Sequence, residues 1–334
     1  MTDRAISIAF QTDKTPAQYV ALARLLDGYD FDMVSVYCDA PFHPSFGPLL
    51  LMAPHLHRAR VGPAGVSPSR MAPIDIAAST ALLDQVAPGG AYLGLVRGAW
   101  LADHGIREVA RPIQAIRETV AIARYLWEGR TGGFQGEVFR LAEHVRAPYP
   151  LPEHPIPVLI GSWGRQLCGL AGEIADEVKV GGSANPDIVP VIREYIAAGE
   201  RRAGRPAGTV GVVLGAVTVA DEDREAARAL ARRQVALYLP VVAPLDPTIA
   251  VEPELIDRLR GRVEAGDQDG AARLIADDLL DRFAFAGNAA DLIEQAGAIF
   301  AAGARRVEFG TPHGLAPERG IHILGRQVIP ALRA

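Results

Sequence analysis

The sequence has little that would support cross-linking or metal binding. Its two cysteines, Cys38 and Cys168, cannot form a disulfide framework, and neither lies in a CxxC motif or in a Cys/His cluster with zinc spacing. The eight histidines are scattered and no carboxylate cluster accompanies them. The first residues lead into the strand-like run Ala5–Phe10 without a basic and apolar leader. We therefore expect no metal site and a reducing, cytoplasmic location.

Charge and hydropathy exclude two further classes of partner. The net charge is −5 and the isoelectric point lies near 5.9, so no basic surface is available to neutralise a phosphate backbone. No apolar run approaches the roughly 20 residues that a membrane-spanning helix needs. Lysine is also scarce, because only Lys14 and Lys179 occur among 34 basic residues. We expect neither nucleic acid nor a membrane as a partner.

Several common catalytic motifs are missing. No GxGxxG follows a predicted strand, and the sequence contains no GxxxxGK[ST], HExxH or GxSxG. Their absence disfavours the usual dinucleotide, nucleotide, zinc-protease and α/β-hydrolase functions. With 49% hydrophobic residues over a length of 334, the chain is nevertheless predicted to fold around a large core.

What the sequence does contain is a regular alternation of short apolar runs with segments of helical periodicity. Eight runs are predicted as strands: Ala5–Phe10, Met33–Tyr37, Ala59–Pro63, Ala91–Val96, Val158–Gly161, Glu177–Gly181, Val210–Val219 and Arg306–Gly310. Helices are predicted over Pro16–Leu26, Ile74–Val86, Ile113–Trp127, Leu167–Ala175, Pro186–Ala203 and Asp223–Leu239. This pattern favours an α/β fold, a single-domain (β/α)8 TIM barrel over residues 1–334, with its site at the carboxyl ends of the strands.

Two segments exceed a minimal barrel. Gly129–Pro157, after the fourth helix, is predicted to form a small hairpin and a proline-rich connection. Pro240–Leu280 is predicted as a mostly helical insertion before the eighth strand.

A distributed set of segments resembles the bacterial luciferase-like superfamily from Ile6 to Pro330. The segments are Phe31–Tyr37 with Asp39 and Pro41, Val61–Pro68, Ala81–Gln85, Gly94–Gly98, Ile116–Val120, Pro157–Ser162 and Leu170–Asp176. Phe283–Asn288 and Gly310–Gly314 are similar to the close of the branch that contains methylenetetrahydromethanopterin reductase. The resemblance implies a barrel that holds coenzyme F420, a deazaflavin, with FMN as the alternative.

The function implied is an F420-dependent oxidoreductase that transfers a hydride between the deazaflavin and a small organic substrate. Two alternatives stay open: an FMN-dependent luciferase-like monooxygenase and a non-catalytic flavin-binding barrel. The resemblance also implies a homodimer formed through helices beside strands two to four. More apolar residues than one buried helix face requires occur in Leu49–His57 and Ile74–Val86, so a partner subunit is expected to cover the second face. The alternative is a monomer in which the Gly129–Pro157 connection covers it.

The resemblance assigns the ring site to the end of the third strand. A cis bond between Ala64 and Gly65, followed by Val66, is expected to bulge beneath the ring; the alternative is an ordinary turn. Asp39, after the second strand, is a candidate proton carrier or the cap of an Asx turn. The resemblance implies a carboxylate residue in the methanopterin reductase at the first-strand position that Ala9 occupies here. The identity of the substrate therefore stays open.

Arg97 and Gly98 follow the fourth strand. There Arg97 would contact the coenzyme and stabilise the anionic reduced ring, or else form a salt bridge with a loop carboxylate. Ser162, Trp163 and Gly164 follow the fifth strand, and Gly181 and Gly182 follow the sixth. The resemblance implies that their amides bind the phosphate arm of the coenzyme, whereas short βα turns would also require glycine.

Glu308 alternates with apolar neighbours on the last strand and is expected to point into the barrel. Burial there would raise its pKa and suit it to donate a proton. Lys179 points inward by the same argument, so a buried Lys179–Glu308 ion pair is the alternative. The candidate catalytic residues are thus Asp39, Arg97 and Glu308.

Overall fold

A computed structural model describes residues 4–334. Residues 1–3 lie outside the described part, so the expectations that concern them, the start of the domain and the N-terminal leader, are not addressed by it. The barrel strands are β1 (Ala5–Phe10), β2 (Met33–Val36), β3 (Arg60–Pro63), β4 (Leu93–Leu95), β7 (Val158–Gly161), β8 (Glu177–Gly181), β9 (Gly211–Ala220) and β11 (Arg306–His313). All pairs between them are parallel, in the order β3-β2-β1-β11-β9-β8-β7-β4.

The ring closes between β3 and β4 through two isolated bridges, Val61 with Ala91 and Val66 with Leu95. The expected TIM-barrel fold is therefore confirmed. The strands are almost continuously buried and mostly apolar, as expected of parallel strands covered by helices on one face and packed against the barrel interior on the other; charged residues lie on β8 and β11.

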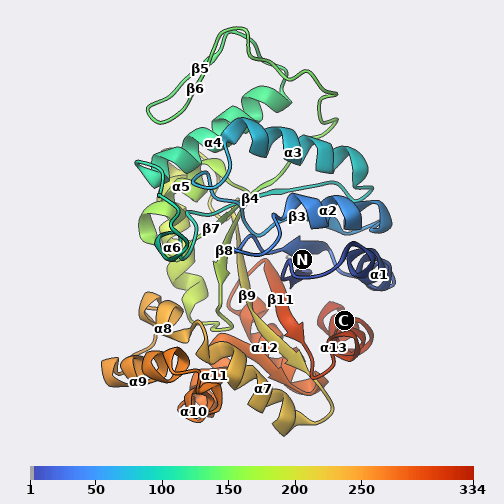
Figure 1. The fold of residues 1–334 in the computed structure, drawn as a ribbon, viewed down its shortest axis with the longest axis vertical. Coiled ribbons are helices and arrows are strands. Elements are labelled where there is room, and N and C mark those ends of the chain that lie inside the picture. The colour runs from blue at the N-terminus through green and yellow to red at the C-terminus, as the bar shows by residue number, and fades with distance from the viewer. Residues whose placement is uncertain (1–3) are drawn as a thin grey trace.

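Helices cover the outside of the barrel (Figure 1). They are α1 (Pro16–Asp27), α2 (Phe46–Met52), α3 (Pro73–Val86), α4 (Pro112–Trp127), α5 (Arg165–Ile174), α6 (Ile188–Arg202), α7 (Arg224–Ala236), α8 (Leu239–Val242), α9 (Pro253–Glu264), α10 (Gln268–Ala272), α11 (Asp277–Phe283), α12 (Ala289–Ala301), α13 (Pro317–Ile323) and α14 (Ile329–Arg333). Short helical turns are η1 (Ala53–His55), η2 (Ala102–His104), η3 (Ala243–Leu245) and η4 (Leu324–Val328). Within residues 4–334, no helix is both long and apolar enough to span a bilayer.

The segment after α4 forms the predicted hairpin, β5 (Phe134–Gln135) with β6 (Arg140–Leu141). Figure 1 shows it beyond α4, on the outside of the barrel. The Glu118 carboxylate of α4 holds it by accepting the backbone N–H groups of Glu137, Val138 and Phe139 at 2.7 to 2.9 Å.

The second insertion is mostly helical and lies before the last barrel strand, as predicted. Its helices α8 to α11 pack with α7 in a hydrophobic cluster separate from the main core. It does not directly precede the last barrel strand, because β10 (Ala284–Gly287) and α12 lie between them. β10 pairs with the second half of β9, from Val217 to Ala220, beyond the part of β9 that β8 covers. Four small or apolar residues next to a helix are too short a run for the period-two pattern to identify.

Candidate active site

The loops that follow the strands meet at the carboxyl end of the barrel, which we call the mouth. Gln11, just after β1, donates from Nε2 to the Asp39 carboxylate at 3.1 Å, so the ends of β1 and β2 are joined there. Trp163, after β7, donates from its indole N–H to the Gly181 carbonyl at 3.0 Å. The first contact joins the predicted site residue Asp39 to Gln11, which was not predicted, and the second joins the predicted residues Trp163 and Gly181 from neighbouring strands.

The Ala64–Gly65 peptide bond is cis, as predicted. Just beyond it, the Val66 N–H donates to the Gly94 carbonyl at 2.9 Å. A Cβ atom added to Gly65 would lie 2.8 Å from that carbonyl group, so only glycine fits. The backbones that leave β3 and β4 therefore approach each other closely at this side of the mouth.

Arg97 is engaged with another side chain. Its Nε and Nη2 groups donate to the two carboxylate oxygens of Glu108 at 2.9 and 3.0 Å. The Arg97 side chain is 54% exposed, so water and Glu108 together screen its charge. The salt bridge expected as an alternative is present. Arg97 is placed to orient the loop after β4 more than to supply an unbalanced charge.

The loop after β7 fits a phosphate group, whereas the expected role of the Gly182 amide after β8 is wrong, because this N–H already donates to the Gly215 carbonyl at 2.6 Å. Gly164 is the N-cap residue of α5, and no side chain caps the amides of its first turn. A Cβ atom at Gly181 would meet nothing within 4 Å, and one at Gly164 would meet only Ser162 Oγ, at 3.9 Å. Free amides at a helix start, reached through open space, are the donor set that binds phosphate. The residues therefore suit a coenzyme with a phosphate arm.

Glu308 lies inside the barrel and is 1% exposed. It forms an ion pair with Lys179 through Oε1, while Oε2 accepts the Ser35 hydroxyl at 2.7 Å. Arg306 donates to the same Oε2 at 3.3 Å and to Glu177 at 2.5 Å. We call Glu177, Arg306, Glu308 and Lys179 the charge column. The predicted inward direction of Lys179 and Glu308, and their pairing, are confirmed.

The expected rise in the pKa of Glu308 is wrong. Burial alone would raise it, but the charges of Lys179 and Arg306 and the hydrogen bonds from Lys179 and Ser35 outweigh burial and lower it. Glu308 is therefore a carboxylate with several partners. Period-two alternation identified its inward direction, and it also places Arg306, two residues earlier on β11, on the same face.

Two residues at the mouth were missed by the sequence analysis. The Tyr37 ring lies over the Lys179 ammonium, 5.4 Å from the ring centroid to Nζ, and burial with the nearby Glu308 charge raises the pKa of Tyr37 well above its usual value. His313 is buried at the end of β11, where Nε2 bonds the Ala9 carbonyl at 3.1 Å. Burial lowers the pKa of His313 to about 4, so the ring is neutral near pH 7. Tyr37 ends a predicted strand, and His313 lies in the turn segment Gly310–Gly314. A position at the carboxyl end of a barrel strand is the one signal that could have identified them.

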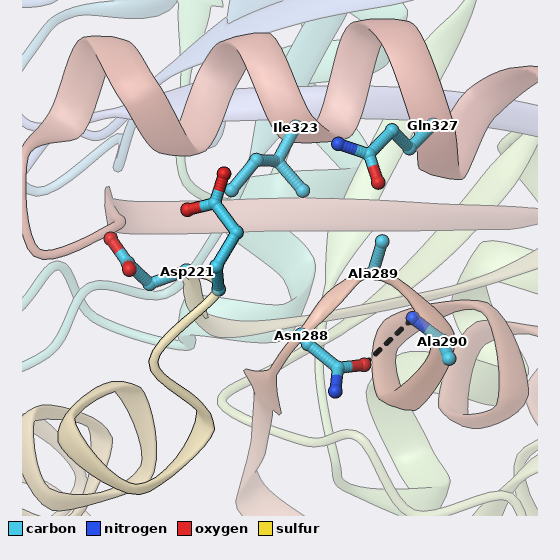
Figure 2. A pocket seen from close by; sticks show the side chains of 7 residues that line it. Asp221, Asn288, Ala289, Ala290, Ile323 and Gln327 are labelled. Carbon is cyan, nitrogen blue, oxygen red and sulfur yellow. Dashed lines mark hydrogen bonds between the residues drawn. The ribbon is translucent and has the colours of Figure 1, made fainter.

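Two cavities are lined by none of the predicted site residues. The first, about 270 Å³, is bounded by Asp221 and Glu222 after β9, Asn288 at the start of α12, and Gln327 (Figure 2). The Asn288 side chain already caps α12 by accepting the Ala290 N–H, and the nearby carboxylates are negative, so this cavity does not suit a phosphate. The second, about 230 Å³, lies at the amino-terminal end of the barrel beside Glu177. Among residues 4–334, no group of three or more His, Cys, Asp and Glu residues is arranged for a metal.

Comparison with known proteins identifies the family. The model of the luciferase-like monooxygenase family matches residues 4–306. The chain belongs to this family.

The relatives match most of the length of the chain. A 5,10-methylenetetrahydromethanopterin reductase from Archaeoglobus fulgidus is 28% identical over 324 residues, covering 94% of this chain and 95% of that reductase. An F420-dependent glucose-6-phosphate dehydrogenase from Nakamurella multipartita is 27% identical, covering 83% of this chain and 78% of that enzyme. The solved coenzyme F420-dependent tetrahydromethanopterin reductase from Methanopyrus kandleri superposes with a TM-score of 0.90 at 23% identity, covering 99% of both chains. The chain is thus homologous to oxidoreductases.

Proposed function

We propose that this chain is an F420-dependent oxidoreductase that binds the deazaflavin at the mouth and transfers a hydride between it and a small organic substrate. The uncapped amides at the start of α5, with open space above Gly164 and Gly181, are the observation that carries the proposal. The two relatives named for F420, together with the methanopterin reductase, support F420 over FMN.

When bound, the deazaflavin supplies the two-electron chemistry, and the chain supplies position and environment. Ser162, Gly164 and Gly181 would hold the phosphate arm. The segment Ala64–Val66 would support the ring from the β3 side, and the Arg97–Glu108 pair would orient the loop after β4. Asp39, tied to Gln11, would orient the substrate or exchange a proton with it.

Two functions fit the same fold with different ligands. A monooxygenase would consume oxygen, and this is the activity that the family description names. In that alternative the bound ring would be FMN. A binding protein would retain the ring without turnover. Both are separated from the proposal by the choice of ligand and by the presence of redox change.

Absorbance titration of the purified protein with coenzyme F420 and, separately, with FMN tests the proposal. We expect saturation by F420 at micromolar concentration and no response to FMN. The loaded protein is then mixed with secondary alcohols, sugar phosphates and reduced pterins while deazaflavin absorbance is followed. Preferential FMN binding with oxygen consumption would favour the monooxygenase. F420 binding without a redox change on any substrate would favour the binding protein.

A further inference from the structure

The charge column has unlike charges at its two ends along the barrel axis. Glu177 and Lys179 lie two residues apart on β8, so both side chains point inward, with Glu177 nearer the amino-terminal end and Lys179 nearer the mouth. Between them, Arg306 contacts Glu177 and Glu308, and Glu308 contacts Lys179. The signs alternate, beginning with a carboxylate and ending with an ammonium. The column therefore presents its positive end to the mouth.

The Lys179 ammonium keeps hydrogen-bonding capacity. It has three N–H donors, and Glu308 is the one acceptor that bonds it within residues 4–334. Its side chain is 8% exposed, while Glu308 and Arg306 below it are at most 1% exposed. The remaining exposure therefore faces the mouth, beside the Tyr37 ring.

Lys179 and Arg97 offer very different environments to a ligand. A charge that is nine-tenths buried is weakly screened by water, whereas Arg97 is half exposed and held by both oxygens of Glu108. A negatively charged ligand would therefore gain more from Lys179 than from Arg97. Reduced deazaflavin is such a ligand because it is anionic when it gives up its hydride.

The path from Lys179 to the proposed ring site is short and runs through Tyr37. Tyr37 covers the Lys179 ammonium, and its chain neighbour Val36 accepts the backbone N–H of Ala64. Tyr37 thus contacts the ammonium through its ring, and the residue before it binds the Ala64–Val66 segment, so both lie at the same end of the barrel.

We propose that Lys179 is a catalytic residue whose ammonium contacts the bound deazaflavin and stabilises the anionic charge of its reduced form, with Glu308 as the positioning residue. This inference rests on the proposed function, because it requires F420 at the mouth. It assigns to Lys179 the electrostatic role that the sequence analysis gave to Arg97.

The ratio of the dissociation constants for oxidised and reduced F420 tests the proposal without any substrate. We expect Lys179→Met to weaken binding of the reduced coenzyme on the order of tenfold more than binding of the oxidised coenzyme, since one hydrogen bond to a charged group is lost. Arg97→Ala should weaken both forms by a similar factor and leave the ratio unchanged. Arg58→Met, at the amino-terminal end of the barrel, is the control for loss of one surface charge.

Lys179→Met leaves Glu308 buried without its cation and could impair folding. The double variant Lys179→Met with Glu308→Gln removes both charges, and we expect the same change in the ratio. A ratio within about twofold of the wild-type value in whichever variant folds would overturn the role of Lys179. Failure of the wild-type protein to bind F420 would instead overturn the proposed function.

The scarcity of lysine allows a second measurement. In Lys14→Arg, Lys179 is the only lysine, so protein labelled with 13C-lysine gives one set of side-chain NMR signals. We expect the Lys179 Cε signal to move on saturation with reduced F420, and to move less with the oxidised form. A signal that does not respond to either form would contradict contact with the coenzyme.

Discussion

Gly215 of β9 lies beneath the Lys179–Glu308 pair, and its missing side chain leaves the space that the pair occupies. A Cβ atom there would lie 3.2 Å from both Glu308 Cβ and Lys179 Cε. We expect Gly215→Ala to lower the free energy of unfolding by about 1 to 3 kcal/mol, because overpacking of a buried site forces neighbours to shift. Urea unfolding measures the change.

Gly261→Ala is the matched control, because this glycine lies in α9 with nothing within 4 Å of an added Cβ atom. There alanine should stabilise the protein by about 0.5 to 1 kcal/mol through helix propensity. Equal effects of the two substitutions would show that the ion pair adjusts freely, contrary to the packing described for it.

For single residues, the sequence predicted which way a side chain points better than it predicted which groups that side chain contacts. Alternation on β8 and β11 predicted that Lys179 and Glu308 face inward and meet. Arg306 precedes Glu308 by two residues on β11, so the same alternation would have placed it on the inward face as well. Alternation could not predict that Ser35 also binds Glu308, because Ser35 lies on β2, whose register is set by the closed barrel. Likewise, Arg97 was correctly placed after a strand, but its partner Glu108 lies in an irregular loop that no periodicity describes.

At the level of elements, the start of α5 should respond to a charge introduced at its N-cap. Asp at position 164 would cap the helix and place a carboxylate beside the proposed phosphate. We expect Gly164→Asp to raise the Kd for F420 on the order of tenfold with little change in thermal stability, since a charged hydrogen-bonding site becomes repulsive. Fluorescence titration measures the Kd.

Gly164→Ser provides the comparison for this prediction, because serine caps the helix without a charge. Its Kd should stay closer to the wild-type value than that of Gly164→Asp. If both variants bind F420 as the wild type does, the phosphate lies elsewhere.

The β5–β6 hairpin depends on one buried carboxylate of α4. Glu118 accepts three hairpin N–H groups and the Gln114 side chain, and these hydrogen bonds lower its pKa despite burial. Because the folded pKa is lowered, its contribution to stability is full above the unfolded pKa of about 4.3 and is lost as pH falls through the folded pKa. We expect Glu118→Gln to cost about 3 kcal/mol in urea unfolding at pH 7.

The cost should shrink as the pH is lowered below about 4, because the wild-type carboxyl is then protonated as well. Glu128→Gln, at the exposed C-cap of α4, should change stability by no more than about 0.5 kcal/mol. A cost at Glu118 that does not change with pH would contradict the role of its charge.

Elements with strong periodicity were predicted well and the connecting ones were not. The six predicted helices and eight barrel strands are present, with ends that shift by a few residues. The strand β10 was not predicted. It pairs with the second half of β9, past the residues that pair with β8, and the β9 sequence shows no break at which this change of partner could be recognised. Where an element ends is set by its partner, and the partner is distant in the chain.

For the molecule as a whole, we expect a homodimer. The Gly129–Pro157 connection contacts α3, where Gln85 donates to the Pro150 carbonyl, but it does not cover α2 and α3 completely. Leu51, Ile74 and Leu82 remain 38 to 48% exposed. Apolar side chains clustered on adjacent helices are stabilised by a two-fold partner. Light scattering at low micromolar concentration should give about twice 35.6 kDa.

Leu51→Glu combined with Leu82→Glu should shift the mass to that of one chain, since charges at an interface core are desolvated without partners. Leu237→Glu, on an exposed position away from α2 and α3, serves as the control and should leave the dimer intact. A wild-type mass near 35.6 kDa would refute the dimer.

The joint between β3 and β4 makes this barrel mechanically an open sheet whose two edges are pinned together. Isolated bridges at Val61 and Val66 hold them, whereas each other pair of neighbouring barrel strands shares a ladder of at least three successive residue pairs. Transient separation of the edges, the local opening that amide hydrogen exchange detects, should therefore begin here. A ligand that touches the residues following both strands would bridge the gap, so its binding would also determine how tightly the ring is closed.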